Sequence, residues 1–138
     1  MTPQEEASLL RHKDFLDKAI QSGRVWGLKH PKRGWVFGWS DRKGKDPVEV
    51  LPFWGSKAAA DRCSYDEWKA FRPTSIPLRD FVSRWLPGMK RDGVLVGTNW
   101  NAKLIGYECT PKELKEQLEA LAEDPELDVL AEMFKEEE

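Results

Sequence analysis

The chain contains 138 residues, of which 40% are hydrophobic and 33% are charged, and this length and composition are typical of one soluble domain rather than of a disordered chain. No segment reaches the roughly 18 consecutive apolar residues of a membrane span, and the first residues lack the apolar stretch of a signal peptide. We therefore expect a cytoplasmic protein that makes no membrane contact.

The net charge of −2 hides an uneven distribution along the chain. Residues 111–138 contain three lysines and eleven acidic residues, which leaves 19 basic and 13 acidic residues in residues 1–110. A basic body with an acidic end suggests either an intramolecular contact between the two or two surfaces with different roles. Cys63 and Cys109 lie 46 positions apart and form no CxxC motif, so we expect reduced thiols rather than a disulfide or a metal site.

The N-terminal half predicts one helix followed by three strands. Thr2, Pro3 and Glu5 combine an N-cap, a proline at the first helical position and a carboxylate that reaches back to the cap. Gly23 is a natural end for this helix. Three extended segments separated by turn-forming residues are then expected to pair as an antiparallel meander, at about 24–29, 34–40 and 48–53.

The second half predicts a helix that packs on the sheet. Apolar side chains from Leu78 to Met89 fall at i, i+3, i+4, i+7, i+8 and i+11 and cover one helix face. Pro87 should end or kink this helix. The other expected elements are a short helix after Ser56, a short strand at 74–76, a hairpin of strands 94–98 and 104–108, and helices beginning at Thr110 and Asp124.

Together these elements predict an α+β domain: a mainly antiparallel sheet of about five strands, with helices packed on one face and a helical C-terminal extension. The single domain is expected to comprise residues 1–122. Residues 123–138 are expected to form an acidic helix that either docks on this domain or binds a partner.

The aromatic residues of the first strands allow two interpretations. Strand alternation places Trp35, Phe37 and Trp39 on one side, and the first interpretation is that these rings, with Trp85, fill the seam between sheet and helix. The second is a stacking platform for single-stranded nucleic acid, formed by Trp26, Trp35 and Trp39 with basic residues at its rim.

Partner-binding residues are predicted in two places. Trp100 lies between Asn99 and Asn101 at the tip of the expected hairpin, where a core role is hard to arrange, and exposed tryptophans are enriched at binding hot spots. A ring that folds back on its own hairpin is the alternative. The remaining candidates are the turn cations Lys32 and Arg33, and Trp26.

No catalytic or metal-binding motif emerges from the sequence. His12 and His30 are the only histidines, and neither has a recognisable catalytic partner; we expect His12 at the surface or its boundary. We therefore predict a noncatalytic domain without a cofactor, a monomer or weak homodimer that binds a protein partner. Single-stranded nucleic-acid binding and small-molecule sensing remain the alternatives.

Several short motifs resemble a known bacterial family. The runs VWGLKHPKRGWVFGW, EVLPFWGSKAAADRC, SIPLRDFVSRWLPGM and DGVLVG, within residues 24–108, resemble the family catalogued as domain of unknown function 2750. The resemblance implies a compact cytoplasmic domain and no particular activity. The layout is also similar to that of secretion-associated proteins and of immunity proteins that neutralise bacterial toxins, which makes a toxin or effector a possible partner; likeness of layout does not carry function by itself.

Overall fold

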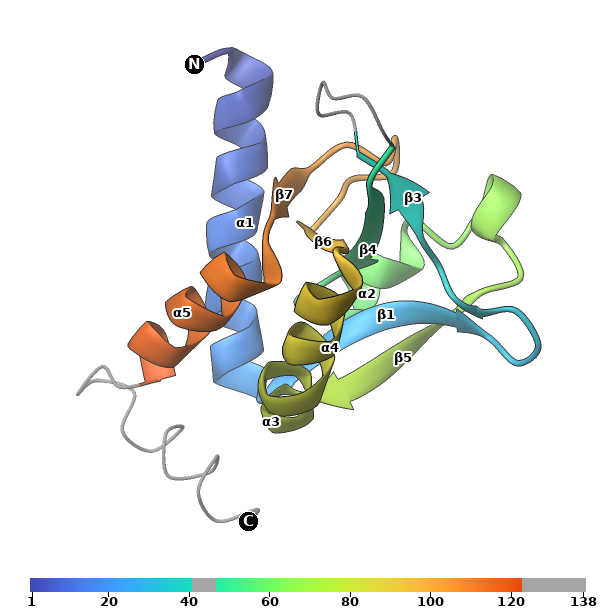
Figure 1. Ribbon diagram of the computed structural model, residues 1–138. Coiled ribbons are helices and arrows are strands. Elements are labelled where there is room, and N and C mark those ends of the chain that lie inside the picture. Colours follow the sequence, from blue (N-terminus) through green and yellow to red (C-terminus); the bar gives the residue numbers. More distant parts are fainter. Residues whose placement is uncertain (41–46, 123–138) are drawn as a thin grey trace.

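The computed structural model describes residues 1–40 and 47–122 (Figure 1). The expected acidic helix at 123–138 lies outside the described residues. In chain order the elements are α1 (Pro3–Ser22), β1 (Arg24–His30), β2 (Gly34–Trp35), β3 (Gly38–Trp39), β4 (Glu49–Phe53), α2 (Lys57–Asp61), a 3-10 turn (Asp66–Trp68), β5 (Arg72–Pro77), α3 (Leu78–Asp80), a π-helical turn (Phe81–Trp85), α4 (Leu86–Asp92), β6 (Leu95–Thr98), β7 (Tyr107–Cys109) and α5 (Pro111–Ala122).

The predicted α+β class is confirmed, and its seven described strands form two sheets rather than one. One sheet has the order β2-β1-β5 and the other β3-β4-β6-β7, and all neighbours are antiparallel except β4 and β6. The segment expected as one strand at 34–40 divides after Trp35, so that β2 pairs with β1 whereas β3 pairs with β4. Trp26 and Trp54 join the sheets by exchanging two backbone hydrogen bonds of 2.7 Å.

The predicted helix starts at Thr2 and Thr110 are confirmed because their signals are local, whereas the start predicted at Asp124 lies outside the described residues. At α1, the Thr2 hydroxyl accepts from the Glu5 amide and the Glu5 carboxylate accepts from the Thr2 amide, and Gly23 ends the helix with a φ of 71°. Thr110 and Glu113 form the same reciprocal pair at α5. The expected hairpin near residue 100 is also confirmed, as β6 and β7.

The helix expected from Leu78 runs through Pro87 to Asp92 without ending at the proline. A π-helical turn, Phe81–Trp85, precedes Pro87, which lies in the first turn of α4. The wider turn changes the hydrogen-bonding register before the proline, so the missing N–H of Pro87 falls where an intrahelical bond is not needed.

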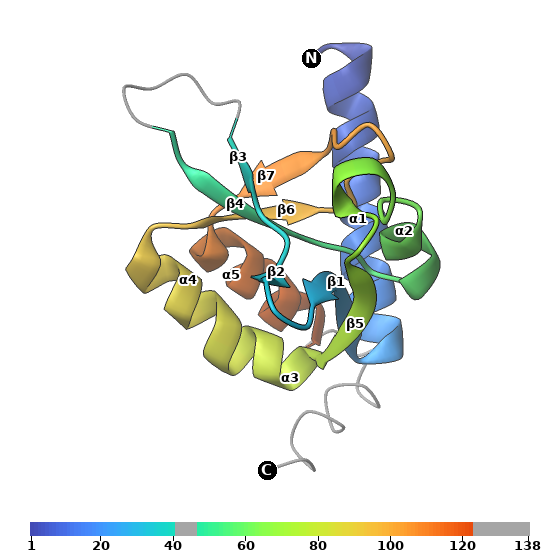
Figure 2. The same cartoon turned by 90° about the vertical axis from the view of Figure 1, so that its right-hand side faces the viewer.

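Two apolar clusters lie on opposite faces of the strands. Val25 of β1 belongs to one cluster together with residues of α1, α4 and α5, whereas Leu28 of the same strand belongs to a second cluster with Ala60 of α2. Side chains whose positions in a strand differ by an odd number, such as 25 and 28, point to opposite faces of the strand. Figures 1 and 2 show α1, α4 and α5 gathered on one side of the strands. The structure therefore carries helices on both faces, with the smaller α2 on the second.

The expected aromatic seam is half confirmed. Trp35 and Trp85 meet edge to face, with ring centres 4.9 Å apart, and both pack against the first cluster. The expectation is wrong for Phe37 and Trp39, which are 49% and 59% exposed. The reason is the crossing from one sheet to the other: Val36 turns into the second cluster and its amide donates to the Leu28 carbonyl, which ends the strand alternation on which the expectation depended.

Candidate functional site

Trp100 is buried, with 7% of its surface exposed. Its indole lies on the backbones of Gly97 and Gly106, where an added Cβ would come within 2.5 Å and 2.3 Å of ring atoms. Its Nε1 donates to the Tyr107 carbonyl at 3.2 Å, and its own carbonyl accepts from Trp54 Nε1 at 2.9 Å. Of the two alternatives for Trp100, the structure therefore shows the ring folded back on its own hairpin, because glycines on both sides of the loop leave room for it.

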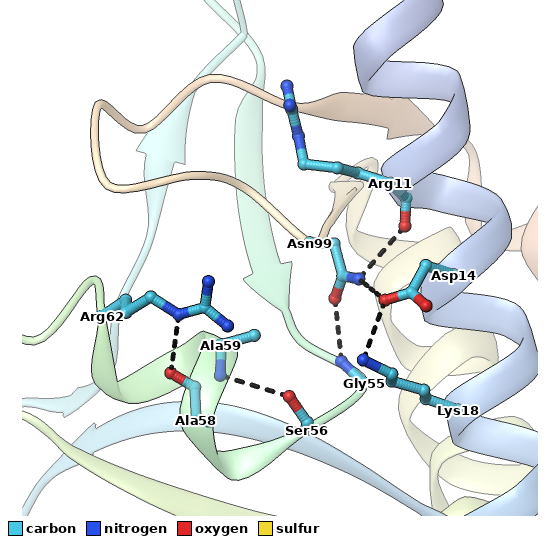
Figure 3. Close-up of polar contacts among 9 residues, drawn as sticks. All are labelled: Arg11, Asp14, Lys18, Gly55, Ser56, Ala58, Ala59, Arg62 and Asn99. Atoms are coloured by element: carbon cyan, nitrogen blue, oxygen red, sulfur yellow. Dashed lines mark hydrogen bonds and ion pairs between the residues drawn. The ribbon is translucent and has the colours of Figure 1, made fainter.

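Asn99 is also buried, and its side chain connects three segments. Its Oδ1 accepts from the Gly55 amide at 2.9 Å, and its Nδ2 donates to the Arg11 carbonyl at 3.1 Å and to Asp14 Oδ2 at 3.3 Å (Figure 3). A backbone φ of 47° orients it for these bonds, a conformation that asparagine tolerates better than most residues. Asn99 therefore holds α1 against the turn before α2.

Asn101 organises the loop that follows. Its side-chain Oδ1 accepts from the amides of Lys103 and Ile105 at 2.9 and 3.1 Å. Leu104 lies inside this turn with a φ of 62°, and it is 41% exposed. A branched side chain in left-handed backbone costs about 1–3 kcal/mol, so this loop holds an apolar side chain toward solvent at a cost in stability.

A groove with a volume of about 1020 Å³ runs beside this loop. Its walls come from the first turns of α1, from β3 and from residues 104–108, and Trp100 and Trp68 also line it. Trp39 and Leu104 contribute exposed apolar surface. Two carboxylates, Glu5 and Glu108, are among the lining side chains, and the described lining contains no lysine or arginine. Of the six residues predicted to bind a partner, only Trp100 belongs to it.

The loop borders a second, smaller pocket of about 310 Å³ with a different character. Here the cations Arg11 and Lys18 of α1 lie beside the loop, with Arg62 from the end of α2 (Figure 3). All three predicted residues of the loop, Asn99, Trp100 and Asn101, line this pocket. Sequence reasoning missed its cations because they come from two helices that are remote from the loop in sequence.

The other predicted contact residues lie elsewhere. Lys32 and Arg33 are exposed in the turn between β1 and β2, where both backbone amides donate to His30 Nδ1 at 3.0 and 3.1 Å. The Arg33 guanidinium lies 4.9 Å from the ring centre of Phe71, a cation–π contact. This turn is thus ordered and basic, but it is separate from the groove lining.

The three rings of the suggested stacking platform do not share one face. Trp26 packs against the second cluster, whereas Trp35 packs against the first. An added Cβ on Gly27 would come within 2.7 Å of the Trp35 ring, so Trp35 covers the face of β1 opposite to Trp26. The predicted platform is therefore wrong as a geometric arrangement.

His12 is buried on the inner face of α1, contrary to the expectation of a surface or boundary residue. Its Nδ1 lies 2.8 Å from Thr98 Oγ1 and its Nε2 lies 2.8 Å from Gln117 Oε1, and the ring stacks on Tyr107 with centres 4.2 Å apart. Burial lowers the pKa of His12 below 6.5, against smaller opposing effects of the Gln117 hydrogen bond and the Glu113 charge. A neutral ring that accepts from Thr98 and donates to Gln117 satisfies both bonds.

Cys63 is held as a thiol beneath the same loop. Its Sγ donates to the carbonyls of Trp100 and Asn101 at 3.4 and 3.3 Å, and burial raises its pKa to about 11. Cys63 and Cys109 are both free and buried. Within residues 1–40 and 47–122, no group of three or more His, Cys, Asp or Glu side chains is arranged to hold a metal ion, and no helix is long and apolar enough to span a membrane.

A comparison with protein families finds one match that covers most of the chain. The model of the family described as "Protein of unknown function (DUF2750)" matches residues 12–118, a range that includes the loop, Lys18 and Arg62 of the smaller pocket and most of the described fold, whereas Arg11 lies just before it. No curated protein and no solved structure matches the chain.

Proposed function

The chain belongs to the DUF2750 family of proteins of unknown function, and we propose that it is a noncatalytic protein-binding domain whose contact site is the groove beside Trp39 and Leu104. One observation carries this proposal: exposed apolar side chains gather there. Six large hydrophobic side chains are exposed among the described residues, and Met1, Trp39 and Leu104 line the groove. Phe37, a fourth, packs edge to face on Trp39. Clustered exposed apolar surface is typical of protein contact sites.

The positions of Trp39 and Leu104, the two anchor side chains of the groove, favour a partner of defined shape. Trp39 lies in β3, which forms one edge of its sheet, and Leu104 projects from the ordered turn around Asn101. Both anchors therefore sit on backbone that is already fixed, so binding orders little of this chain. Tryptophan is among the residues that most often dominate binding energies.

The charge of the groove selects the class of partner segment. Glu5 and Glu108 line it without a lysine or arginine in the described lining, although the rest of residues 1–110 is basic. Complementary charge speeds association and excludes wrong partners. The segment that fits is an apolar or aromatic anchor with a lysine or arginine beside it.

Within this proposal, the domain is an immunity-type protein of the bacterial cytoplasm, and the segment belongs to a toxin or effector that it neutralises. The similarity of layout to immunity proteins and the free, buried cysteines support this version. His12, with both ring nitrogens engaged, and Cys63, held as a thiol, support a noncatalytic role.

The proposal is tested by selecting displayed random peptides against the whole chain. Selected peptides should combine an apolar anchor with a basic residue, and Trp39→Ser should weaken their binding about tenfold or more, as loss of a hot-spot residue does. Leu10→Ser is the matched control, because Leu10 is an exposed apolar residue outside the groove; it should leave binding unchanged.

Leu104→Asn separates binding from folding in the same assay. Asparagine is more tolerant of left-handed backbone than leucine, so this variant should unfold at the same or a higher temperature than the wild type while it binds the selected peptides more weakly. Equal losses for Trp39→Ser and Leu10→Ser, or selected peptides without basic residues, would contradict the proposal. Salt-sensitive binding of single-stranded RNA that competes with the peptides would favour the nucleic-acid alternative instead.

A further inference from the structure

We infer that the smaller pocket between α1 and α2 binds the oxyanion group, phosphate or carboxylate, of a compact small molecule. The pocket encloses about 310 Å³ and is lined by Arg11, Lys18 and Arg62 with a single carboxylate, Asp14. This site is separate from the proposed protein-binding groove and does not depend on it, although the loop at Trp100 borders both.

The position of the cations follows from the helices that carry them. Arg11, Asp14 and Lys18 are spaced at i, i+3 and i+7 along α1, which places them on one helix face. Arg62 reaches the same space from the C-terminal end of α2 (Figure 3). Asn99 fixes the two helices relative to each other through its bonds to the Arg11 carbonyl and the Gly55 amide. Asn99 is therefore a positioning residue for the pocket.

The balance of charge leaves the arginines uncompensated within the described part of the chain. Lys18 pairs with Asp14 at 3.3 Å, and this is the only ion pair among residues 1–40 and 47–122. Arg11 donates through Nη2 to Ser8 Oγ at 3.2 Å, and Arg62 donates through Nε to the Ala58 carbonyl at 3.4 Å. Each guanidinium carries five N–H donors, so most of these donors have no acceptor within residues 1–40 and 47–122.

Arg11 gives a more specific indication. Its Nε is buried and has no hydrogen-bond partner among the described residues, and an unsatisfied buried donor in a folded protein calls for an explanation such as a missing ion. A guanidinium in this position gains by turning toward an anion that accepts two of its N–H groups at once. Arginine is preferred over lysine where a carboxylate or phosphate is bound by two parallel hydrogen bonds, because the planar guanidinium can form this bidentate contact.

Pocket size and walls limit the ligand. A volume of about 310 Å³ lies at the lower end of the range for small-molecule sites. The pocket is also lined by Ala59, Ala102 and Trp100, which lie beside the cations. The pocket therefore suits a compact phosphorylated or carboxylated molecule whose uncharged part is small.

The test is calorimetric titration of the full chain with inorganic phosphate and, separately, with citrate, at an ionic strength held constant with sodium chloride. We expect saturable binding of at least one of the two anions, and the one that binds identifies phosphate or carboxylate as the source. The double variant R11Q/R62Q should weaken that binding about tenfold or more. The matched control is K32Q/R33Q, which removes the same charge from the exposed β1–β2 turn and should bind as the wild type does.

Two further variants keep the outcome decisive. R62Q alone changes an exposed residue and should fold normally while it weakens binding, so it replaces the double variant if that fails to fold. R62K keeps the charge but loses the bidentate hydrogen-bonding geometry, and its affinity for the anion should lie between those of R62Q and the wild type. Absence of saturable binding to both anions, or an equal loss in K32Q/R33Q, would overturn the inference. Trp39→Ser should leave anion binding unchanged, which separates this result from the fate of the groove proposal.

Discussion

His12 is a titratable group packed between two polar partners and an aromatic ring. Burial favours its neutral form and lowers its pKa below 6.5. The unfolded chain therefore binds more protons than the folded chain once the pH falls below about 6.5. The stabilising contribution of the neutral ring is complete above that pH and is lost progressively as the pH falls toward the lower pKa of the folded state.

We predict that the free energy of unfolding of the wild type decreases between pH 7.5 and pH 5.5, and that His12→Gln shows a smaller decrease. The variant should also be less stable at pH 7.5 by about 1–3 kcal/mol, because Thr98 and Gln117 lose a buried partner. Urea unfolding followed by tryptophan fluorescence measures both effects. The same pH profile for His12→Gln as for the wild type would refute this account.

At the residue scale the sequence misleads wherever the surroundings come from distant segments. No residue near His12 in the sequence indicates that Thr98 and Gln117 are its hydrogen-bond partners. In the sequence, His12 is therefore indistinguishable from a surface histidine on a helix. The sequence left two alternatives open for Trp100 for the same reason, because its burial depends on glycines whose closeness to the ring follows only from the folded loop. Trp39 is the converse case, an aromatic residue in a strand that is exposed because the strand changes sheets before it.

At the scale of elements, the loop from Asn99 to Gly106 packs as a unit against the sheet β3-β4-β6-β7. The Trp100 ring lies on Gly97, in β6, and on Gly106. The backbone carbonyl of Trp100 accepts hydrogen bonds from the side chains of Trp54 and Cys63. Because interiors are close-packed, this contact fixes where Leu104 emerges, and thereby one wall of the groove. The loop connects packing in the core directly to the proposed contact surface.

We predict that Gly97→Ala destabilises the protein by about 1–3 kcal/mol, the usual cost of forcing extra volume into a packed site. An added Cβ there would come within 2.5 Å of Trp100 Nε1. Gly38→Ala tests the same ring from another side with an ordinary contact of 3.6 Å, and it should cost clearly less. Chemical denaturation of both variants gives the comparison, and equal stabilities would show that the ring does not need the glycine backbone.

Elements whose signals are local were predictable. The reciprocal Thr–Glu caps at Thr2 and Thr110 placed the starts of α1 and α5 correctly, since the atoms concerned are three residues apart. Pro87 predicted an end or a kink of the helix, whereas the π-helical turn directly before it lets the helix continue to Asp92. The division of 34–40 into two strands was not predictable, since it depends on which strand each half meets.

At the scale of the whole molecule, the α+β class and the family followed from sequence, but the groove did not. Its walls come from residues 1–9, from β3 and from residues 104–108, three segments that no periodicity connects. The smaller pocket likewise joins two helices and a loop. The sequence singled out the loop at Asn99–Asn101, whose residues line the smaller pocket, but it did not show that Asn99 and Trp100 are buried.

The most direct measurement of the central claim is hydrogen–deuterium exchange of the chain, free and saturated with a peptide or protein partner. If the groove is the contact site, exchange should slow at Gly38–Trp39 and across residues 104–108, with smaller changes in the turn that carries Lys32 and Arg33. Protection concentrated in that basic turn, with the groove segments exchanging as fast as in the free chain, would contradict the account.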